Sequence, residues 1–121
     1  MATILKIKKI RGLDADRYLR RLQKLSTEVI ASEKADYVAK IFSALADPAR
    51  IRILKLLEKE SMCICDLTIT FGLRQPLISY HLKILKESGL VKPIKKGKWV
   101  FYEIADKRLV RLISRITETI K

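Results

Sequence analysis

Two cysteines, Cys63 and Cys65, are the residues whose type and spacing most clearly suggest chemistry, and they are the only cysteines in the chain. Thiolates are soft ligands that select As(III), Sb(III), Hg(II), Cd(II) or Cu(I) over Mg²⁺ and Ca²⁺. A single pair one residue apart does not fit the disulfide framework of a secreted protein. We therefore interpret the pair as metal ligands or redox-active thiols. The only cofactor that the sequence suggests is As(III) or another thiophilic metal ion.

The spacing of this pair leaves several uses open. In a regular helix, residues two apart point about 200° away from each other, so both thiolates can face one ion only if the start of the helix is distorted. A trigonal arsenic site needs a third sulfur ligand, which the chain lacks. Two-coordinate Hg(II) or Cu(I) and an exogenous thiol remain open. The alternatives are oxidation of the pair to a disulfide, or thiols that simply fill the core.

A second group of residues has the chemistry of a DNA contact. Residues 75–88 have helical periodicity, with Ile78, Leu82 and Leu85 on one face and hydroxyl, aromatic and ammonium groups on the other. Such a helix is suited to enter a major groove. The predicted DNA contacts here are Arg74, Gln75, Pro76, Ser79, Tyr80, His81 and Lys83. For His81, a packed core position is an equal alternative.

After Gly89 the apolar period changes to two, which predicts a β-hairpin around the turn Lys95-Lys96-Gly97-Lys98. We expect Lys95, Lys96 and Lys98 to contact phosphate or the minor groove, and Trp99 and Phe101 to form the core of the hairpin.

The charge balance supports a nucleic-acid partner. Lys and Arg number 26 against 13 Asp and Glu, which gives a formal charge of +13. This surplus favours double-stranded DNA as the partner, with a solvated lysine-rich exterior as the alternative. Aromatic residues make up only 7% and form no stripe, so a membrane surface is excluded as a partner. No long apolar run or secretory signal is present, and we expect a cytoplasmic protein.

The cysteine pair and the predicted DNA contacts must be positioned by a mainly α-helical fold. The sequence predicts a basic N-terminal arm at residues 1–12 and one domain at 13–121. Helices are expected from Asp14 to about residue 30, from Val38 to Leu45 after a polar stretch at 32–36, from Pro48, over 63–71, over 75–88, and from about Asp106. Two helices joined at Gly72 form a helix-turn-helix unit. The first and last helices carry apolar stripes that predict a homodimer interface, formed by Tyr18, Leu22, Leu25, Val29, Leu109, Leu112, Ile113 and Ile116.

An enzyme is not indicated. His81, the only histidine, has no plausible nucleophile with a relaying acid nearby, and no glycine-rich phosphate loop is present.

Four motifs in order resemble the ArsR/SmtB family of metal-responsive winged-helix repressors over about residues 34–121. They are Leu45-Ala46-Asp47-Pro48-Ala49-Arg50, Cys63-Ile64-Cys65-Asp66-Leu67, Ser79-Tyr80-His81-Leu82-Lys83 with Glu87-Ser88-Gly89-Leu90-Val91, and Gly97-Lys98-Trp99-Val100-Phe101-Tyr102. The resemblance implies a dimeric winged helix-turn-helix fold and a homodimer that reads a palindromic operator and leaves it when an effector binds. It also implies that Cys63 and Cys65 match the family's arsenic and soft-metal motif.

The chain departs from the zinc-sensing branch of this family. Asp106 is followed by Lys107 and Arg108, and the terminal helix contains no histidine, so a zinc site there is not expected. The sequence thus predicts a sequence-specific repressor released by a soft metal bound at Cys63 and Cys65. A thiol-redox repressor that uses the same cysteines and a sequence-neutral architectural DNA-binding protein are the alternatives.

Overall fold

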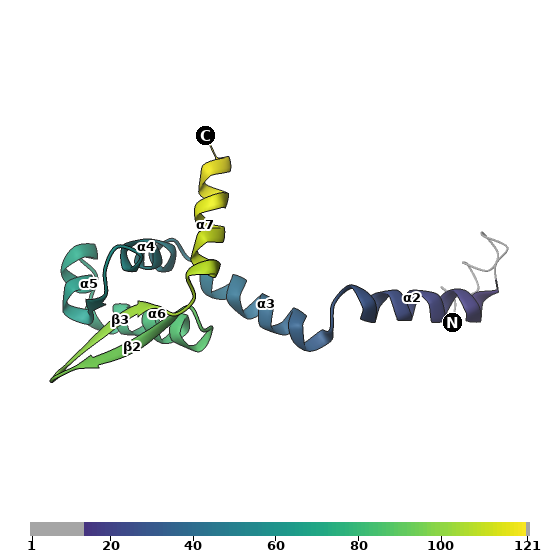
Figure 1. Cartoon of the computed structure of the whole chain (residues 1–121), viewed down its shortest axis with the longest axis horizontal. Helices are drawn as coiled ribbons and strands as arrows, with labels where there is room; N and C mark the ends of the chain where they lie inside the picture. Colours follow the sequence, from purple (N-terminus) through teal and green to yellow (C-terminus); the bar gives the residue numbers. More distant parts are fainter. Residues whose placement is uncertain (1–13, 121) are drawn as a thin grey trace. The chain divides into compact units, whose positions relative to one another are not determined.

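The computed structural model describes residues 14–120, so the predicted basic arm at 1–12 lies outside the described residues. The chain divides into two compact units, Met1–Val38 and Ala39–Lys121. With the labels of Figure 1, the elements are α2 (Ala15–Val29), α3 (Ser32–Leu45), α4 (Pro48–Leu57), β1 (Met62–Cys63), α5 (Ile64–Phe71), α6 (Gln75–Glu87), β2 (Val91–Lys96), β3 (Trp99–Ile104) and α7 (Lys107–Thr119). The prediction of a mainly helical chain with a small antiparallel sheet is confirmed.

Helix α2 begins at an acidic cap. The Asp14 carboxylate accepts hydrogen bonds from the backbone N–H groups of Asp16 at 3.1 Å and Arg17 at 3.4 Å, which satisfies donors that the first turn leaves free. Most of the predicted apolar stripe is exposed in the single chain, at Leu22 (40%), Leu25 (42%) and Val29 (76%), while Tyr18 is half-buried.

Helix α3 begins earlier than the sequence predicts. The polar stretch at 32–36 is its first turn rather than a connection to a helix that starts at Val38. No proline or glycine interrupts this stretch, and Glu33 in the first turn is favourable near the positive end of the helix. Polarity therefore marks the exposed first turn of the helix, and the helix boundary lies before it.

One hydrophobic core holds the second unit together. Its most completely buried apolar side chains, each at most 1% exposed, come from the helices α3 to α7 and from the residue just before β2: Ala44, Ile53, Leu54, Leu67, Ile78, Leu82, Leu85, Leu90 and Val110. In α6 the buried apolar residues are spaced by four and three, which buries one stripe of that helix, as the periodicity predicts. Capping hydrogen bonds and proline define where α4 begins. For α4, the Asp47 carboxylate accepts from Ala49 N–H at 2.8 Å, and Pro48 occupies the first turn.

Helices α5 and α6 form the predicted helix-turn-helix unit. Helix α5 ends at Gly72, which has a left-handed φ of 64° and donates its N–H to the Thr68 carbonyl at 2.9 Å. A residue with a Cβ would be strained in this conformation. The chain then enters α6 within three residues, so the tight turn fixes the direction of the second helix.

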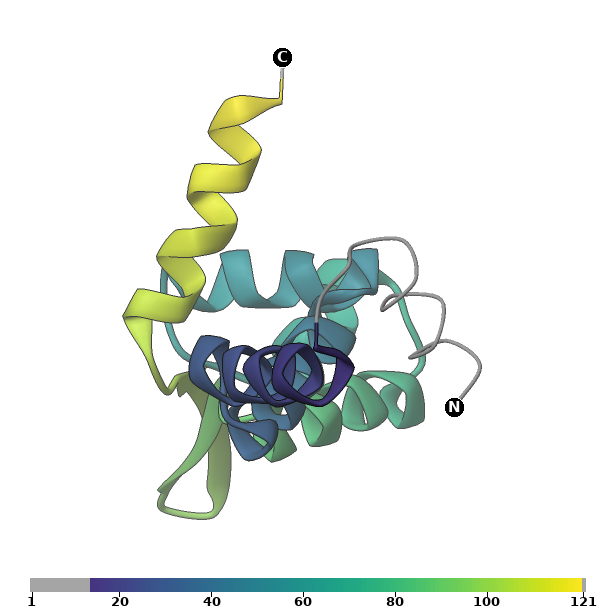
Figure 2. The same cartoon turned by 90° about the vertical axis from the view of Figure 1, so that its right-hand side faces the viewer.

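The sheet has one strand that the sequence does not predict. Its order is β1-β3-β2, and both pairings are antiparallel. The β2–β3 hairpin turns at Gly97 (φ 62°) and projects beyond the helices of the second unit (Figure 1 and Figure 2). The missed strand, β1, places Met62 opposite Tyr102 and Cys63 opposite Phe101. Two residues are too short to show a period-two pattern.

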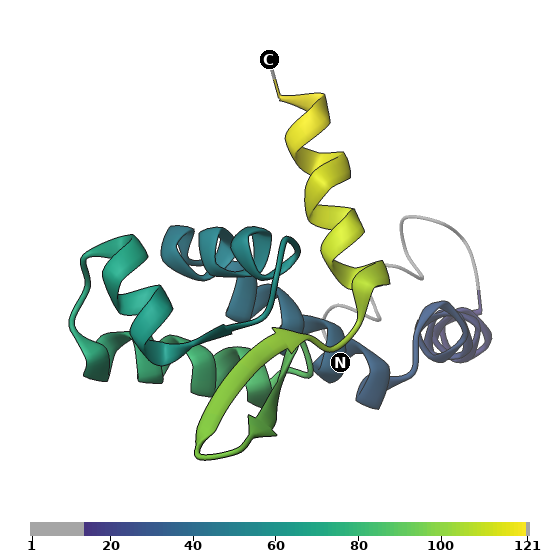
Figure 3. The same cartoon turned by 60° about the vertical axis from the view of Figure 1, so that its left-hand side comes forward.

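Helix α7 leads away from the sheet (Figure 3). Its residues Val110 and Ile113 are buried in the core of the second unit, whereas Leu112, Ile116 and Ile120 are 52%, 57% and 72% exposed. Of the residues predicted at the dimer interface, Ile113 therefore belongs to the core of its own chain, and Leu109 packs partly against that core. Within residues 14–120, no helix combines the length and apolar character needed to cross a membrane.

Candidate nucleic-acid interface and cysteine pair

The two faces of α6 differ sharply in burial. Ile78, Leu82 and Leu85 are at most 1% exposed, which anchors the helix on the core. On the opposite side, Pro76 and Lys83 are exposed and Tyr80 is 56% exposed. The structure thus gathers a phenol and an ammonium group on one solvent-facing surface of a firmly packed helix, with the half-buried Ser79 at its edge.

The N-terminus of α6 is open to an anion. Arg74 is the N-cap residue and makes no side-chain capping hydrogen bond, and the first turn contains no acidic residue. Arg74 and Gln75 are both exposed. The positive end of the helix and the Arg74 guanidinium together suit a phosphate group.

His81 does not share this exposed surface. It is only 5% exposed, and its Nδ1 lies 3.3 Å from Nη1 of Arg50 in α4. The expectation that His81 contacts DNA therefore does not agree with its position, because the ring is packed inside the unit. Of the two positions that the sequence leaves open for His81, the structure favours the packed core position.

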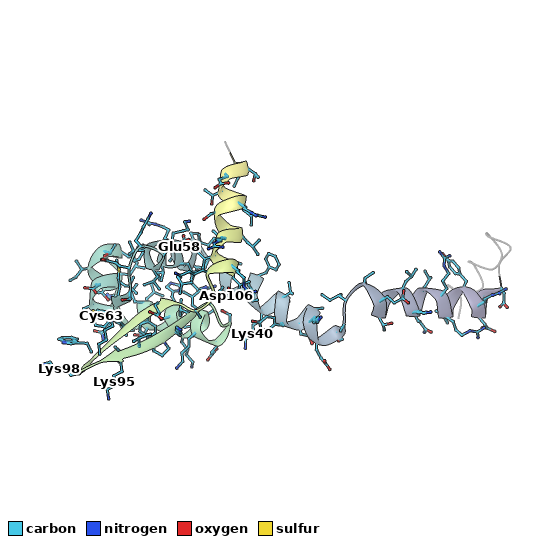
Figure 4. The ribbon with its side chains drawn as sticks, in the orientation of Figure 1. Lys40, Glu58, Cys63, Lys95, Lys98 and Asp106 are labelled. Atoms are coloured by element: carbon cyan, nitrogen blue, oxygen red, sulfur yellow. The ribbon has the colours of Figure 1, made fainter. Side chains whose placement is uncertain are left out.

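The hairpin tip is strongly cationic. Lys95, Lys96 and Lys98 are all exposed, and within the described part of the chain none of them forms an ion pair. Lys95 and Lys98 lie at the free end of the hairpin in Figure 4. Gly97 between them allows the tight turn. The tip thus offers uncompensated positive charge to a phosphate backbone.

Trp99 corrects one expectation. The sequence assigns it to the core of the hairpin, but its side chain is 53% exposed, and the ammonium of Lys98 lies 5.8 Å from the centre of its ring. Phe101 is half-buried. Trp99 pairs with Lys96 in the last rung of the hairpin, where the turn leaves no layer to cover it. Its place directly after the turn was the signal that sequence reasoning missed.

Cys63 and Cys65 lie at the junction of the sheet and α5, and Figure 4 labels Cys63 there. Cys63 is half-buried, Cys65 is exposed, and both are free thiols. Cys63 has extended backbone angles (φ −86°, ψ 170°) as the N-cap residue of α5, and its N–H donates to Asp66 Oδ2 at 3.1 Å. Because Cys63 precedes the helix, the opposed directions of a regular helix do not apply to the pair.

The pair has the donor chemistry for a thiophilic ion but supplies only two sulfurs. Among the described residues, no group of three His, Cys, Asp or Glu side chains is arranged to hold a metal. His81 is also unsuitable, since it is buried against Arg50. Two sulfur donors are enough for a soft ion that prefers two ligands. A three-coordinate ion would need a donor from outside this chain.

Comparison with known proteins identifies close relatives. Residues 47–92 match the model of the bacterial regulatory protein, arsR family. The chain is 47% identical to an HTH-type transcriptional regulator of Methanocaldococcus jannaschii over 87 residues, which are 71% of this chain and 98% of that protein. It is 40% identical to the arsenical resistance operon repressor of Bacillus subtilis, over 60% of this chain and 70% of that protein.

A solved structure confirms the winged helix-turn-helix fold. The homodimeric winged helix-turn-helix DNA-binding domain from Mycobacterium bovis superposes with a TM-score of 0.69 at 28% identity, and the match covers 73% of this chain and 82% of that one. The helix-turn-helix predicted from the sequence and the hairpin that serves as its wing therefore have a counterpart in a known DNA-binding domain.

Proposed function

The chain belongs to the ArsR family of bacterial regulatory proteins, and from this premise we propose that it is a repressor that leaves its operator when a thiophilic ion binds Cys63 and Cys65. Its relatives are transcriptional regulators, so the chain is a DNA-binding regulator and not an enzyme. The finer parts of the proposal are the DNA-contacting residues, the effector and the dimer.

The observation that carries DNA binding is the exposed surface of α6 beside an uncompensated cationic wing. A helix in the major groove places its side chains against base edges, while lysines on the wing contact phosphate. We assign base or phosphate contacts to Gln75, Ser79 and Tyr80, and phosphate contacts to Arg74, Lys83 and the wing lysines. Pro76 lies on the same surface, and the exposed Trp99 joins the wing.

The assembly is a homodimer in this proposal. The solved domain from Mycobacterium bovis is homodimeric, and this chain leaves large apolar side chains of α2 and α7 exposed. Apolar surface of this kind is stabilised by a partner. Of the predicted interface residues, Tyr18, Leu22, Leu25, Val29, Leu112 and Ile116 remain in the proposed interface, with Leu109 at its margin.

The effector is a soft metal or metalloid ion. A relative is named as an arsenical resistance repressor, and two thiols at the start of the helix before α6 match the softness of such ions. When bound, the ion holds the two thiolates together. If this favours a dimer shape with lower operator affinity, a coupling of about 3 kcal/mol changes that affinity on the order of a hundredfold. The cytoplasm, which keeps thiols reduced, is the compartment for this function.

The test is a titration of the reduced protein bound to the DNA just upstream of its own gene. As(III), Hg(II), Cd(II) and Zn(II) are added in turn, while thiolate-to-metal absorption and DNA release are followed together. We expect at least one soft ion to release the native protein and to leave a Cys63→Ser/Cys65→Ser variant on the DNA. Release by oxidation alone would replace the metal with a thiol switch, and no release by either would remove the cysteines from the mechanism.

A parallel measurement separates a regulator from an architectural protein. Salt dependence does not distinguish them, because phosphate contacts contribute to the salt dependence of both. A specific regulator binds its operator about a thousandfold or more tightly than random DNA. Equal affinity for both duplexes would favour the sequence-neutral alternative.

A further inference from the structure

Arg50 connects three parts of the second unit through one guanidinium group. From α4, its Nε donates to the Ala44 carbonyl at 2.6 Å and its Nη2 donates to the Ser43 carbonyl at 3.4 Å, both in the last turn of α3. Its Nη1 lies 3.3 Å from Nδ1 of His81 in α6. The side chain is only 11% exposed. This charged group is therefore held among the helices and is directed at the helix that we propose reads DNA.

The contacts to α3 explain why a buried cation is stable here. The last carbonyl groups of a helix have no partner within the helix, and the helix end carries partial negative charge. Arg50 supplies hydrogen bonds and positive charge to that end. Asp47 adds a carboxylate, with Oδ1 accepting from the Arg50 backbone N–H at 3.2 Å and Oδ2 4.0 Å from Nη1. The guanidinium is thus fixed on the corner between α3 and α4.

The contact between Arg50 and His81 is a hydrogen bond in only one tautomer of the imidazole ring. Arginine stays charged and only donates hydrogen bonds, so Nδ1 of His81 must be the acceptor and Nε2 carries the proton. A protonated imidazole would have no acceptor to offer. Arg50 contacts His81, the centre of the Tyr80 ring is 5.8 Å from that of His81, and Asp47 interacts with His81 electrostatically.

Position along α6 makes this contact relevant to DNA reading. His81 follows Tyr80 directly and precedes Lys83 by two residues, so its direction sets where those two exposed side chains point. The apolar contacts of Ile78, Leu82 and Leu85 favour burial of that face but have little directional preference. A hydrogen bond from a planar guanidinium depends on direction and therefore restricts rotation of the helix about its axis.

We propose that Arg50 is a positioning residue for DNA recognition, which holds the rotation of α6 against the corner between α3 and α4 through His81. The proposal rests on the proposed function, because it assumes that α6 reads DNA. It extends that function by naming a residue that touches no base and determines specificity through another element. Loss of the contact leaves α6 folded while its exposed side chains lose their register with the base edges.

The test compares His81→Leu, which removes the acceptor and keeps an apolar volume, with His81→Asn, whose Oδ1 is an acceptor near the position of Nδ1. A second route is Arg50→Lys, which keeps the charge but replaces the planar fork of three nitrogens by a single nitrogen that cannot reach all three acceptors at once. Each variant is titrated with a duplex that the native protein selects from a random library and with a scrambled duplex. Thermal unfolding is followed by circular dichroism.

We expect His81→Leu and Arg50→Lys to weaken binding to the selected duplex about tenfold or more, with the scrambled duplex bound as by the native protein. His81→Asn should bind the selected duplex within about threefold of the native protein. A purely structural role would instead lower both affinities equally in step with the melting temperature, or would show no rescue by Asn. Either result overturns the inference, as does unchanged selectivity in all three variants.

Lys83→Ala separates this inference from the proposed function. Lys83 is exposed on the proposed DNA-facing side of α6, and it is not among the hydrogen-bond partners of the Arg50 side chain. If Lys83→Ala weakens DNA binding while His81→Leu and Arg50→Lys do not, only the positioning role fails. If Lys83→Ala also changes neither affinity, reading of DNA by α6 fails and the inference fails with it.

Discussion

Helix α6 and the Cys63–Cys65 pair differ in how firmly the rest of the chain holds them. Three side chains on the inner face of α6 are almost completely buried, and His81 adds a hydrogen-bonded anchor. Cys65 is exposed, and Cys63 is only half-buried at the end of a two-residue strand. One chain thus carries a firmly packed helix, which we propose reads DNA, and a loosely held pair of thiols, which we propose binds an ion. Specific recognition needs the first property, and a response to an ion needs the second.

The largest expected effect comes from weakening the anchor of α6. Leu82→Ala removes a side chain that is 1% exposed and should lower the free energy of unfolding by about 2 to 5 kcal/mol. Urea denaturation measures this loss. DNA binding should fall with it, because the helix loses its support. A loss below about 1 kcal/mol would show that α6 is held less firmly than its burial indicates.

Removing the charge of the wing should have the next largest effect. In a Lys95→Ala/Lys96→Ala/Lys98→Ala variant, affinity for DNA should fall about tenfold or more at low salt. The slope of log affinity against log salt should become shallower by about 2 to 3 for each protomer. Titrations at several salt concentrations measure both quantities. An unchanged slope would mean that the lysines stay in solvent when DNA binds, and stability should be unaffected in either case.

Substitution of an exposed cysteine should change the response to metal but not the stability of the protein. Cys65→Ser should change the free energy of unfolding by less than about 0.5 kcal/mol, because the side chain is exposed, while it removes the metal-dependent release of DNA. Denaturation and metal titration on the same preparation test both parts. If Cys65→Ser lowers the free energy of unfolding as much as Leu82→Ala does, the cysteine pair is held as firmly as α6, and the contrast between them is wrong.

The smallest expected effect depends on pH and concerns the corner that supports α6. Burial raises the pKa of Asp47, but the backbone N–H groups of Arg50 and Ala49 and the nearby positive charge of Arg50 lower it more, so the net pKa lies below 3.8. A carboxyl with a lowered pKa contributes stability above its unfolded pKa and loses it as the pH falls through the folded value.

Asp47→Asn keeps a capping side chain and removes this charge. Its melting temperature should be slightly lower than that of the native protein at neutral pH, and the gap should close as the pH falls below 3.8 and through the lower folded value. Melting curves over this pH range supply the measurement. A gap that stays constant with pH would assign the effect to the cap geometry instead of the charge. The corresponding profile of Cys65→Ser should show no such convergence.

The sequence predicts the structure best where buried residues recur at a regular spacing. The spacing of Ile78, Leu82 and Leu85 predicts both the helix and its buried face, and Gly72 predicts the turn before it. These features follow from local geometry, in which residues three and four apart share a face. The hairpin and its cationic turn were predicted for the same reason, since a period of two around Gly97 has one simple explanation.

Contacts between distant residues could not be predicted in this way. The hydrogen bond between Arg50 and His81 joins residues 31 positions apart, so the exact place of His81 is decided by tertiary packing. Strand β1 is too short to leave a pattern and exists because β3 offers it an edge. The exposure of Trp99 likewise depends on what covers the end of the hairpin, which no local period describes.

Strand β1 has a mechanical consequence for the signal. Cys63 pairs with Phe101, and β3, which contains Phe101, continues directly into the wing through Trp99. In the proposed function, one of the two thiols that bind the ion is therefore on a residue paired with Phe101, and Phe101 lies two residues along β3 from Trp99, next to the turn that carries the wing lysines. If ion binding shifts the backbone at Cys63, that shift passes directly to the strand that leads to the wing lysines.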